Sequence, residues 1–399
     1  MRPPFPRTPR LRSAALPFAA NGVLYGTWAA RLPEIQARTG LSEGALGLAL
    51  VASAVGLVIS ASAAGTLVAR FGTHRVMLAS LAVVGVVVVG PGLATGLWSL
   101  IAALLLLGLA SGMLDVSMNA HAAGTEAAEG TAILGSCHGM FSLGMMVGAG
   151  LGALAARLDV ALAVHFGATA LAVVGPALAQ GLRAAEPPGA EAEAGGRVVA
   201  LPVGPVAGLA ALAFCGLVVE GAMADWSAVF LREVLAASEA VAALGVAAFS
   251  GCMAAARFGA DALTARLGDR RLVGAGAAVG AVGLGLVVAA PAVAVALTGF
   301  AFVGLGMAAV IPALFRAAST APGLRPGVGI AAVTGTGYLG FLAGPPTLGF
   351  LAEAAGLRVS FGLLLALALG MALGAGAAFR RARPEAVGAD GRRAGVDSP

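Results

Sequence analysis

Long apolar runs, separated by short segments rich in Gly, Pro or charged residues, repeat along the whole chain. A membrane-spanning helix needs about 20 apolar residues, and most of the runs reach that length. The pattern therefore predicts an all-α integral membrane protein with twelve transmembrane helices. They are expected near residues 14–32, 44–68, 75–94, 98–121, 131–156 and 160–182, and then 204–231, 240–264, 272–290, 293–316, 327–352 and 357–379.

Composition agrees with this class and excludes others. The mean hydropathy of +0.95 and the charged fraction of 11% exclude an ordinary soluble domain. The pI near 10 does not indicate nucleic-acid binding, because no basic patch with interleaved aromatic residues is present. Cys137, Cys215 and Cys252 lie inside apolar runs without CxxC spacing. We therefore expect no metal, no cofactor and no disulfide.

The basic residues are distributed unevenly between the two sets of loops. All 24 are arginines, and 19 of them fall in alternate gaps between the apolar runs. This alternation is typical of a multi-pass protein whose two ends lie in the cytoplasm. It predicts an inner-membrane protein with a cytoplasmic tail at 1–13, a cytoplasmic linker at 183–203 and a cytoplasmic tail at 380–399. The first apolar run resembles a signal peptide, but it continues the rhythm of its successors, which favours a first transmembrane helix.

The two halves of the chain resemble each other at an offset of 196 residues. Arg70, Gly72 and Arg75 map onto Arg266, Gly268 and Arg271, and several glycines map in the same way, among them Gly108 onto Gly304 and Gly144 onto Gly340. Such a repeat predicts two six-helix bundles, 14–182 and 204–379, arranged as parallel repeats about an axis along the membrane normal.

On these residues the chain resembles a major facilitator superfamily transporter over essentially its full length. The loop 65–75 is similar to that superfamily's signature between spans two and three, although Ala69 stands where the signature usually has Asp. The second copy keeps an acidic residue in this region, Asp261. The resemblance implies gating roles for both loops, carried by Arg70, Arg75, Asp261, Arg266 and Arg271.

A bacterial branch near the fucose permeases has a similar pattern on spans four, five and seven. The matching residues are Asp115, Asn119, His138, Ser142, Asp225, Trp226 and Ser227. The superfamily resemblance further implies that spans one, four, seven and ten line a central cavity.

Ionisable side chains inside a span are costly and indicate function. Asp115 has Asn119 at i+4 on the same helix face. We expect Asp115 to carry a proton or contact the solute; a structural bond to a neighbouring helix is the alternative. His138 is expected at a similar depth, where it could relay protons with Asp115 or simply pack between helices. Glu220, deep in span seven, is predicted to face the cavity and take part in proton coupling.

The first span presents Asn21, Tyr25 and Trp28 at i, i+4 and i+7, on one helical face. Such a face suits binding of a sugar or another polar ring, and it equally suits ordinary packing. Together with Asn119, these three residues form the predicted solute-binding set.

Three further contacts and one further position are predicted from the sequence. An outer gate is expected between Arg31 and Asp225, with an Arg31–Glu34 pair as the alternative. Trp226 is expected at the membrane interface, and Arg257 is expected to pair with Asp261. The small-xxx-small stripe Gly144, Gly148 and Gly152 is expected to form a close helix contact.

The predicted function is secondary active transport of a small polar, sugar-like solute by alternating access, with the chain acting as a proton-coupled symporter and as a monomer. The alternative is a drug or metabolite exporter of the same fold, ahead of a channel or receptor-like protein. No HExxH motif and no GxSxG motif in a strand–turn–helix context is present, so the chain is not expected to be an enzyme.

Overall fold

The computed structural model describes residues 8–183 and 204–382, and within these ranges the chain is helical, without strands. The N-terminal half contains α1 (Pro9–Ala29), α2 (Leu32–Thr39), α3 (Glu43–Phe71), α4 (Thr73–Val87), η1 (Gly90–Leu93), α5 (Leu97–Glu129), α6 (Leu134–Arg157) and α7 (Leu162–Gly181). The C-terminal half contains η2 (Gly204–Val206), α8 (Ala207–Leu235), α9 (Glu239–Ala242), α10 (Leu244–Ala289), α11 (Val293–Met307), α12 (Val310–Ser319), α13 (Pro326–Ala355) and α14 (Leu357–Arg381).

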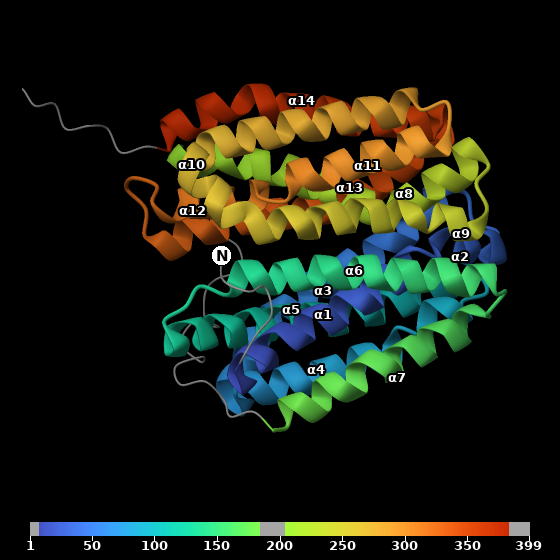
Figure 1. The fold of residues 1–399 in the computed structure, drawn as a ribbon, viewed down its shortest axis with the longest axis horizontal. Coiled ribbons are helices and arrows are strands. Elements are labelled where there is room, and N and C mark those ends of the chain that lie inside the picture. Colours follow the sequence, from blue (N-terminus) through green and yellow to red (C-terminus); the bar gives the residue numbers. More distant parts are fainter. Residues whose placement is uncertain (1–7, 184–203, 383–399) are drawn as a thin grey trace, which may run out of the picture.

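Eleven helical segments of the described chain are long and apolar enough to cross a membrane. α1 is not one of them, because polar residues such as Arg10, Arg12 and Asn21 reduce its hydropathy. It nevertheless runs along α6 inside the bundle (Figure 1). With α1 included, the structure has the predicted architecture of twelve spanning segments in two halves.

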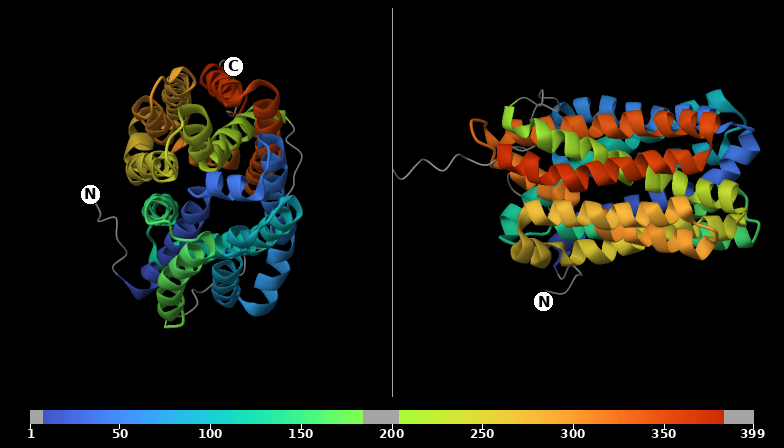
Figure 2. Two further views of the ribbon diagram at one scale, coloured as in Figure 1. Left: turned by 90° about the vertical axis from the view of Figure 1, so that its right-hand side faces the viewer. Right: turned by 90° about the horizontal axis from the view of Figure 1, so that it is seen from above.

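The two halves lie side by side, and their long helices run roughly parallel or antiparallel to one another (Figures 1 and 2). Both ends of the described chain lie at one end of the bundle, which we call the N/C face; it also carries the turns at Gly72, Gly130 and Gly268. The opposite end, the far face, carries α2 and α9.

The internal repeat predicted from the sequence is visible in the backbone. Gly72 has φ 82° and ψ 148°, and its counterpart Gly268 has φ 71° and ψ 157°. Residues other than glycine rarely adopt these backbone angles. Each of these glycines ends one spanning segment and starts the next, which explains why they recur at the same place in both copies.

The helix boundaries differ from the predicted spans in several places. Span ten, predicted near 293–316, is one candidate span over Val293–Ser319, but its helix is broken between α11 and α12. Pro312 causes this break, because a proline lacks the N–H that would bond to the carbonyl of Ala308 and its ring clashes with that carbonyl. α1 begins at Pro9 rather than at residue 14, and α5 extends to Glu129 rather than to residue 121. The linker at 184–203 and most of both predicted tails lie outside the described residues.

The predicted close contact of the glycine stripe on α6 is confirmed. A Cβ atom on Gly148 would lie only 2.8 Å from the backbone nitrogen of Thr27, and one on Gly144 would lie 2.9 Å from that of Val23. In the other direction, Gly22 and Gly26 of α1 lie against the backbone of α6. The missing side chains therefore let α1 and α6 approach at backbone distance.

Candidate functional site

Asp115 lies in the middle of α5, between the two halves. Its Oδ1 accepts a hydrogen bond from the Asn119 amide at 3.1 Å, as the i+4 spacing suggests. Its Oδ2 accepts a bond at 3.4 Å from the hydroxyl of Tyr338 on α13, in the opposite half. No salt bridge in the described ranges includes Asp115. The carboxyl group is therefore held by neutral donors alone.

A second hydrogen bond between a tyrosine and an aspartate joins the halves, and in this one the tyrosine belongs to the N-terminal half. The hydroxyl of Tyr25 on α1 donates to Oδ1 of Asp225 on α8 at 3.1 Å. Asp225 is 7% exposed. The Tyr25 ring packs edge-on against Trp28, with centroids 5.4 Å apart, and lies 6.3 Å from the ring of Phe141 on α6. The predicted solute-binding pair Tyr25 and Trp28 thus belongs to one aromatic group, while Asn21 is buried nearby on α1.

Arg257 of α10 joins three helices. One of its terminal nitrogens donates to Oε1 of Glu220 at 2.9 Å, and the other donates to Oγ of Ser142 on α6 at 2.7 Å. Its Nε lies 3.5 Å from the carbonyl of Ala308, the carbonyl that Pro312 leaves without a helical partner. Glu220 is 19% exposed, and its Oε2 is buried without a partner in the described structure.

These contacts lie next to one another. The Tyr338 ring stacks on Phe341, with centroids 6.4 Å apart, and Phe341 packs against Gly221, the neighbour of Glu220. On the other side, Phe141, whose ring lies 6.3 Å from that of Tyr25, is the neighbour of Ser142. We call the polar residues of this region the interhalf cluster: Tyr25, Asp115, Asn119, Ser142, Glu220, Asp225, Arg257 and Tyr338.

Two predicted partnerships are not formed. His138 packs edge-on against Phe18, with centroids 5.2 Å apart, and lies within electrostatic reach of Arg257; it makes no bond to Asp115. Arg31 is 1% exposed and pairs with Glu34, the alternative considered for it, and it also donates to the Val160 carbonyl at 3.0 Å. The proposed Arg31–Asp225 gate is therefore absent in this conformation.

Two further expectations need correction. Trp226 was expected at the membrane interface but is 0% exposed, inside the core. Arg257 was expected to pair with Asp261 but binds Glu220; the side chain of Asp261 lies outside the described part of the structure.

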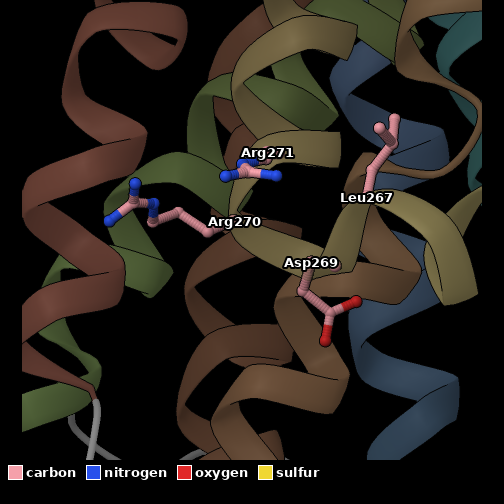
Figure 3. Close-up of a pocket in the computed structure, with 5 residues that line it drawn as sticks. Leu267, Asp269, Arg270 and Arg271 are labelled. Atoms are coloured by element: carbon pink, nitrogen blue, oxygen red, sulfur yellow. The ribbon is translucent and has the colours of Figure 1, made fainter.

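The two signature loops lie at the N/C face. Arg70, Arg75, Arg266 and Arg271 are exposed there, and the Arg70 guanidinium lies 5.2 Å from the centroid of the Phe71 ring. In the second loop, residues 267–271 surround a shallow hollow of about 340 Å³. Figure 3 shows the Asp269 carboxylate directed away from Arg270 and Arg271. Asp269 instead pairs with Arg316 of α12 at 2.7 Å.

A different contact joins the halves at the far face. The Glu353 carboxylate at the end of α13 accepts bonds from the Ser42 hydroxyl at 3.2 Å and from the Gly44 N–H at 3.1 Å. It therefore occupies the N-terminus of α3, where backbone N–H groups lack helical partners. Gly47 and Gly349 also meet here, since a Cβ atom on Gly349 would lie 3.0 Å from the Cα atom of Gly47.

Two residues of the interhalf cluster were missed or misassigned from the sequence, Tyr338 and Arg257, and Ser142 was noted only as part of the resemblance, without a role. Tyr338 did have a signal, because the chain contains only two tyrosines and both could have been examined as polar groups inside spans. Pro312 was a second signal, since a proline in a span frees a carbonyl that needs a donor.

Comparison with known proteins agrees with this architecture. An uncharacterized MFS-type transporter of Yersinia pestis is 32% identical over 368 residues, which cover 92% of this chain and 95% of that protein. Membrane protein MosC of Rhizobium meliloti is 29% identical over 384 residues, covering 94% and 92% of the two chains.

Two solved structures have similar folds. A mutant form of the nucleoside transporter NupG matches with a TM-score of 0.72 and 12% identity, over 93% of this chain and 100% of that chain. A bacterial homolog of the human lysosomal transporter Spinster, in an inward-facing and occupied conformation, matches with a TM-score of 0.73 and 14% identity, over 93% and 96%.

The match to the family itself extends over both halves. Residues 17–234 and 209–398 each match the Major Facilitator Superfamily. The first segment contains most of the N-terminal bundle and extends into α8, the second contains most of the C-terminal bundle, and together they cover nearly the whole chain. The chain therefore belongs to the Major Facilitator Superfamily and is a transporter of that type.

Proposed function

We propose that this transporter moves a small polar solute by alternating access and couples the movement to protons. The observation that carries this proposal is that Asp115 and Asp225, both within spanning helices, each accept a hydrogen bond from a tyrosine of the opposite half. Bonds between halves break when the halves rock apart. The ionisation of these carboxyl groups is thereby linked to the conformational change.

The distribution of contacts between the halves supports an alternating mechanism. Hydrogen bonds join the halves at the far face, around Glu353, and midway along the bundle, in the interhalf cluster. This arrangement fits a conformation closed at the far face. The interhalf cluster then lies beneath that closure, where a solute bound from the N/C face would meet it.

We assign the proton to Asp115. A carboxyl group in apolar surroundings can take up and release a proton near neutral pH when no cation holds it ionised. Among the described residues, the side chain of Asp115 has Asn119 and Tyr338 as its hydrogen-bond partners, whereas Glu220 is held by Arg257. The earlier candidates Glu220 and His138 then serve as neighbours of Arg257 rather than as the main proton site.

Orientation follows from the arginines. We propose that the N/C face is cytoplasmic, because the arginine-rich gaps lie on that side, and that the protein resides as a monomer in the inner membrane. The resemblance to fucose permease relatives supports a sugar-like solute and import as a symporter. Export of a drug or metabolite by the same fold is the alternative. Reporter fusions at residue 399 and in the far-face turn at residue 160 test the orientation.

The test of function is transport in vesicles that contain the purified protein. Solutes would be added with and without an imposed proton gradient, and uptake and internal pH would be followed together. We expect Asp115→Asn to abolish uphill accumulation while solute exchange at equal pH continues. The matched control is Glu129→Gln on the same helix, whose carboxylate lies 3.8 Å from Arg10 at the N/C face, away from the cluster. Normal gradient-driven accumulation by Asp115→Asn would contradict the proton assignment.

A further inference from the structure

The charges of the interhalf cluster do not balance. It contains three carboxyl groups, from Asp115, Glu220 and Asp225, and one cation, Arg257. If Asp115 takes the proton, as proposed above, one carboxylate still lacks a cation. From this imbalance we infer that the transported solute carries a protonated amine, which binds Asp225. This inference rests on the proposed transport function and specifies its substrate class.

Asp225 is the carboxylate that lacks compensation. The described residues give its side chain one hydrogen bond, from the neutral Tyr25 hydroxyl at 3.1 Å, and no salt bridge. The side chain is 7% exposed, in the interior of α8. A buried carboxylate in a spanning helix is normally paired or marks a binding site. Arg31, the arginine expected to neutralise it, is bound to Glu34 and Val160 instead.

Arg257 is not available to Asp225 either. Its nitrogens already face Glu220, Ser142 and the Ala308 carbonyl. Moreover, Oε2 of Glu220 is a buried acceptor without a partner among the described residues. The described residues therefore leave the charge of Asp225 without a cation and one oxygen of Glu220 without a donor. An ammonium group has three donors and no acceptor, which is the complement of this site.

The aromatic rings around Tyr25 also favour a cationic ligand. Tyr25 lies 5.4 Å from Trp28 and 6.3 Å from Phe141, measured between ring centroids. The face of an aromatic ring attracts a cation, most strongly in a site shielded from water. A carboxylate bound to one member of this aromatic group favours an organic amine over a neutral polyol, and it disfavours an anion.

The test uses pairs of solutes that differ by one amine: D-glucosamine with D-glucose, serinol with glycerol, and putrescine with 1,4-butanediol. Binding to the purified full-length protein is measured by thermal stabilisation, and uptake is measured in vesicles. We expect at least one amine to bind at least tenfold more tightly than its hydroxyl counterpart. Asp225→Asn should remove this preference, whereas Glu129→Gln should retain it.

Tyr25→Phe is a second variant, which retains the carboxylate if Asp225→Asn fails to fold. It should preserve the preference for amines while changing their affinity. Equal binding of both members of every pair, an amine preference that survives Asp225→Asn, or the absence of binding by all three amines would each overturn the inference.

The outcomes separate this inference from the transport proposal. An amine that binds through Asp225 but never enters vesicles would contradict transport and leave the binding site in place. Proton-driven uptake of a neutral solute that is unchanged in Asp225→Asn would support transport and overturn the amine inference alone.

Discussion

The hydroxyl of Tyr338 in the C-terminal half lies 3.4 Å from Oδ2 of Asp115 in the N-terminal half. Tyr25 and Asp225 form the reverse link, from the N-terminal to the C-terminal half. These are the only two tyrosines of the chain, and each hydroxyl serves an aspartate of the opposite bundle. A transporter that separates and rejoins its halves must break and remake such bonds.

The first prediction concerns this bond. Tyr338→Phe keeps the ring that stacks on Phe341 and removes only the hydroxyl, so the fold should be unchanged. A hydrogen bond of this kind contributes about 1 kcal/mol, which corresponds to about a fivefold change in rate. We expect initial proton-driven uptake in vesicles to fall by about that factor, with Asp115→Asn having the larger effect. Unaltered uptake would show that the bond is incidental.

The second prediction concerns the charge pair of Arg257 and Glu220. Removing one partner of a buried pair leaves the other charge uncompensated and costs about 3–5 kcal/mol. Arg257→Ala should therefore reduce thermal stability and yield. Because the cost arises from the charge left on Glu220, the double variant Arg257→Ala/Glu220→Gln should recover much of the stability.

Thermal unfolding of the single and double variants in detergent checks this. Ser142→Ala is the matched control, because it removes one acceptor of Arg257 without stranding a charge. A double variant no more stable than Arg257→Ala would show that packing of the arginine, rather than charge, stabilises the site.

The third prediction concerns the far face. Glu353 of the C-terminal half binds the N-terminal end of α3 through Ser42 and Gly44. A carboxylate at a helix N-terminus contributes up to about 1 kcal/mol, so Glu353→Ala should increase the fraction of molecules open at the far face by up to about fivefold.

Distances between spin labels at Ala37 and Ala355, one in each half, would report this opening in a background without Cys137, Cys215 and Cys252. Glu43→Ala is the control, because that carboxylate lies in the first turn of α3 but makes none of the described bonds to the other half. Identical distance distributions in the wild type and in Glu353→Ala would show that Glu353 does not hold the far face closed.

The fourth prediction concerns the contact between α1 and α6. Gly148→Leu inserts a side chain where a Cβ atom alone would lie 2.8 Å from the backbone of Thr27. Overpacking of this kind costs about 1–3 kcal/mol, and thermal stability should fall accordingly. Gly150→Leu, two residues away on the same helix, points into open space and should have little effect. Equal stability of the two variants would contradict the close contact.

The sequence was sufficient for the architecture because membrane insertion makes hydrophobicity, arginine placement and glycine loops strongly informative. The equivalence of Gly72 and Gly268, inferred from spacing, reappears as the same backbone conformation. Partnerships in the site were harder to predict. Arg31 had two acidic candidates, and spacing alone does not decide whether the local Glu34 or the distant Asp225 lies nearer.

Arg257 illustrates the same limit. Its neighbours Glu220, Ser142 and Ala308 come from α8, from α6 and from the turn between α11 and α12, and their approach depends on how the bundles pack rather than on any periodicity. The sequence predicts how far along a span a side chain lies. Which neighbouring helix the side chain faces depends on how the helices pack, and this is seen only in the structure.

The two tyrosine–aspartate bonds are not copies of each other. At the offset of 196 residues, the N-terminal counterpart of Tyr338 is Ser142, and the counterpart of Asp225 is Ala29. A hypothetical homodimer of N-terminal halves would thus present Asp115 without a tyrosine and Tyr25 without an aspartate. Although the scaffold is duplicated, its chemistry is divided between the copies. In this sense the two halves resemble two different subunits joined in one chain. As separate polypeptides they could complement each other, but neither half could replace the other.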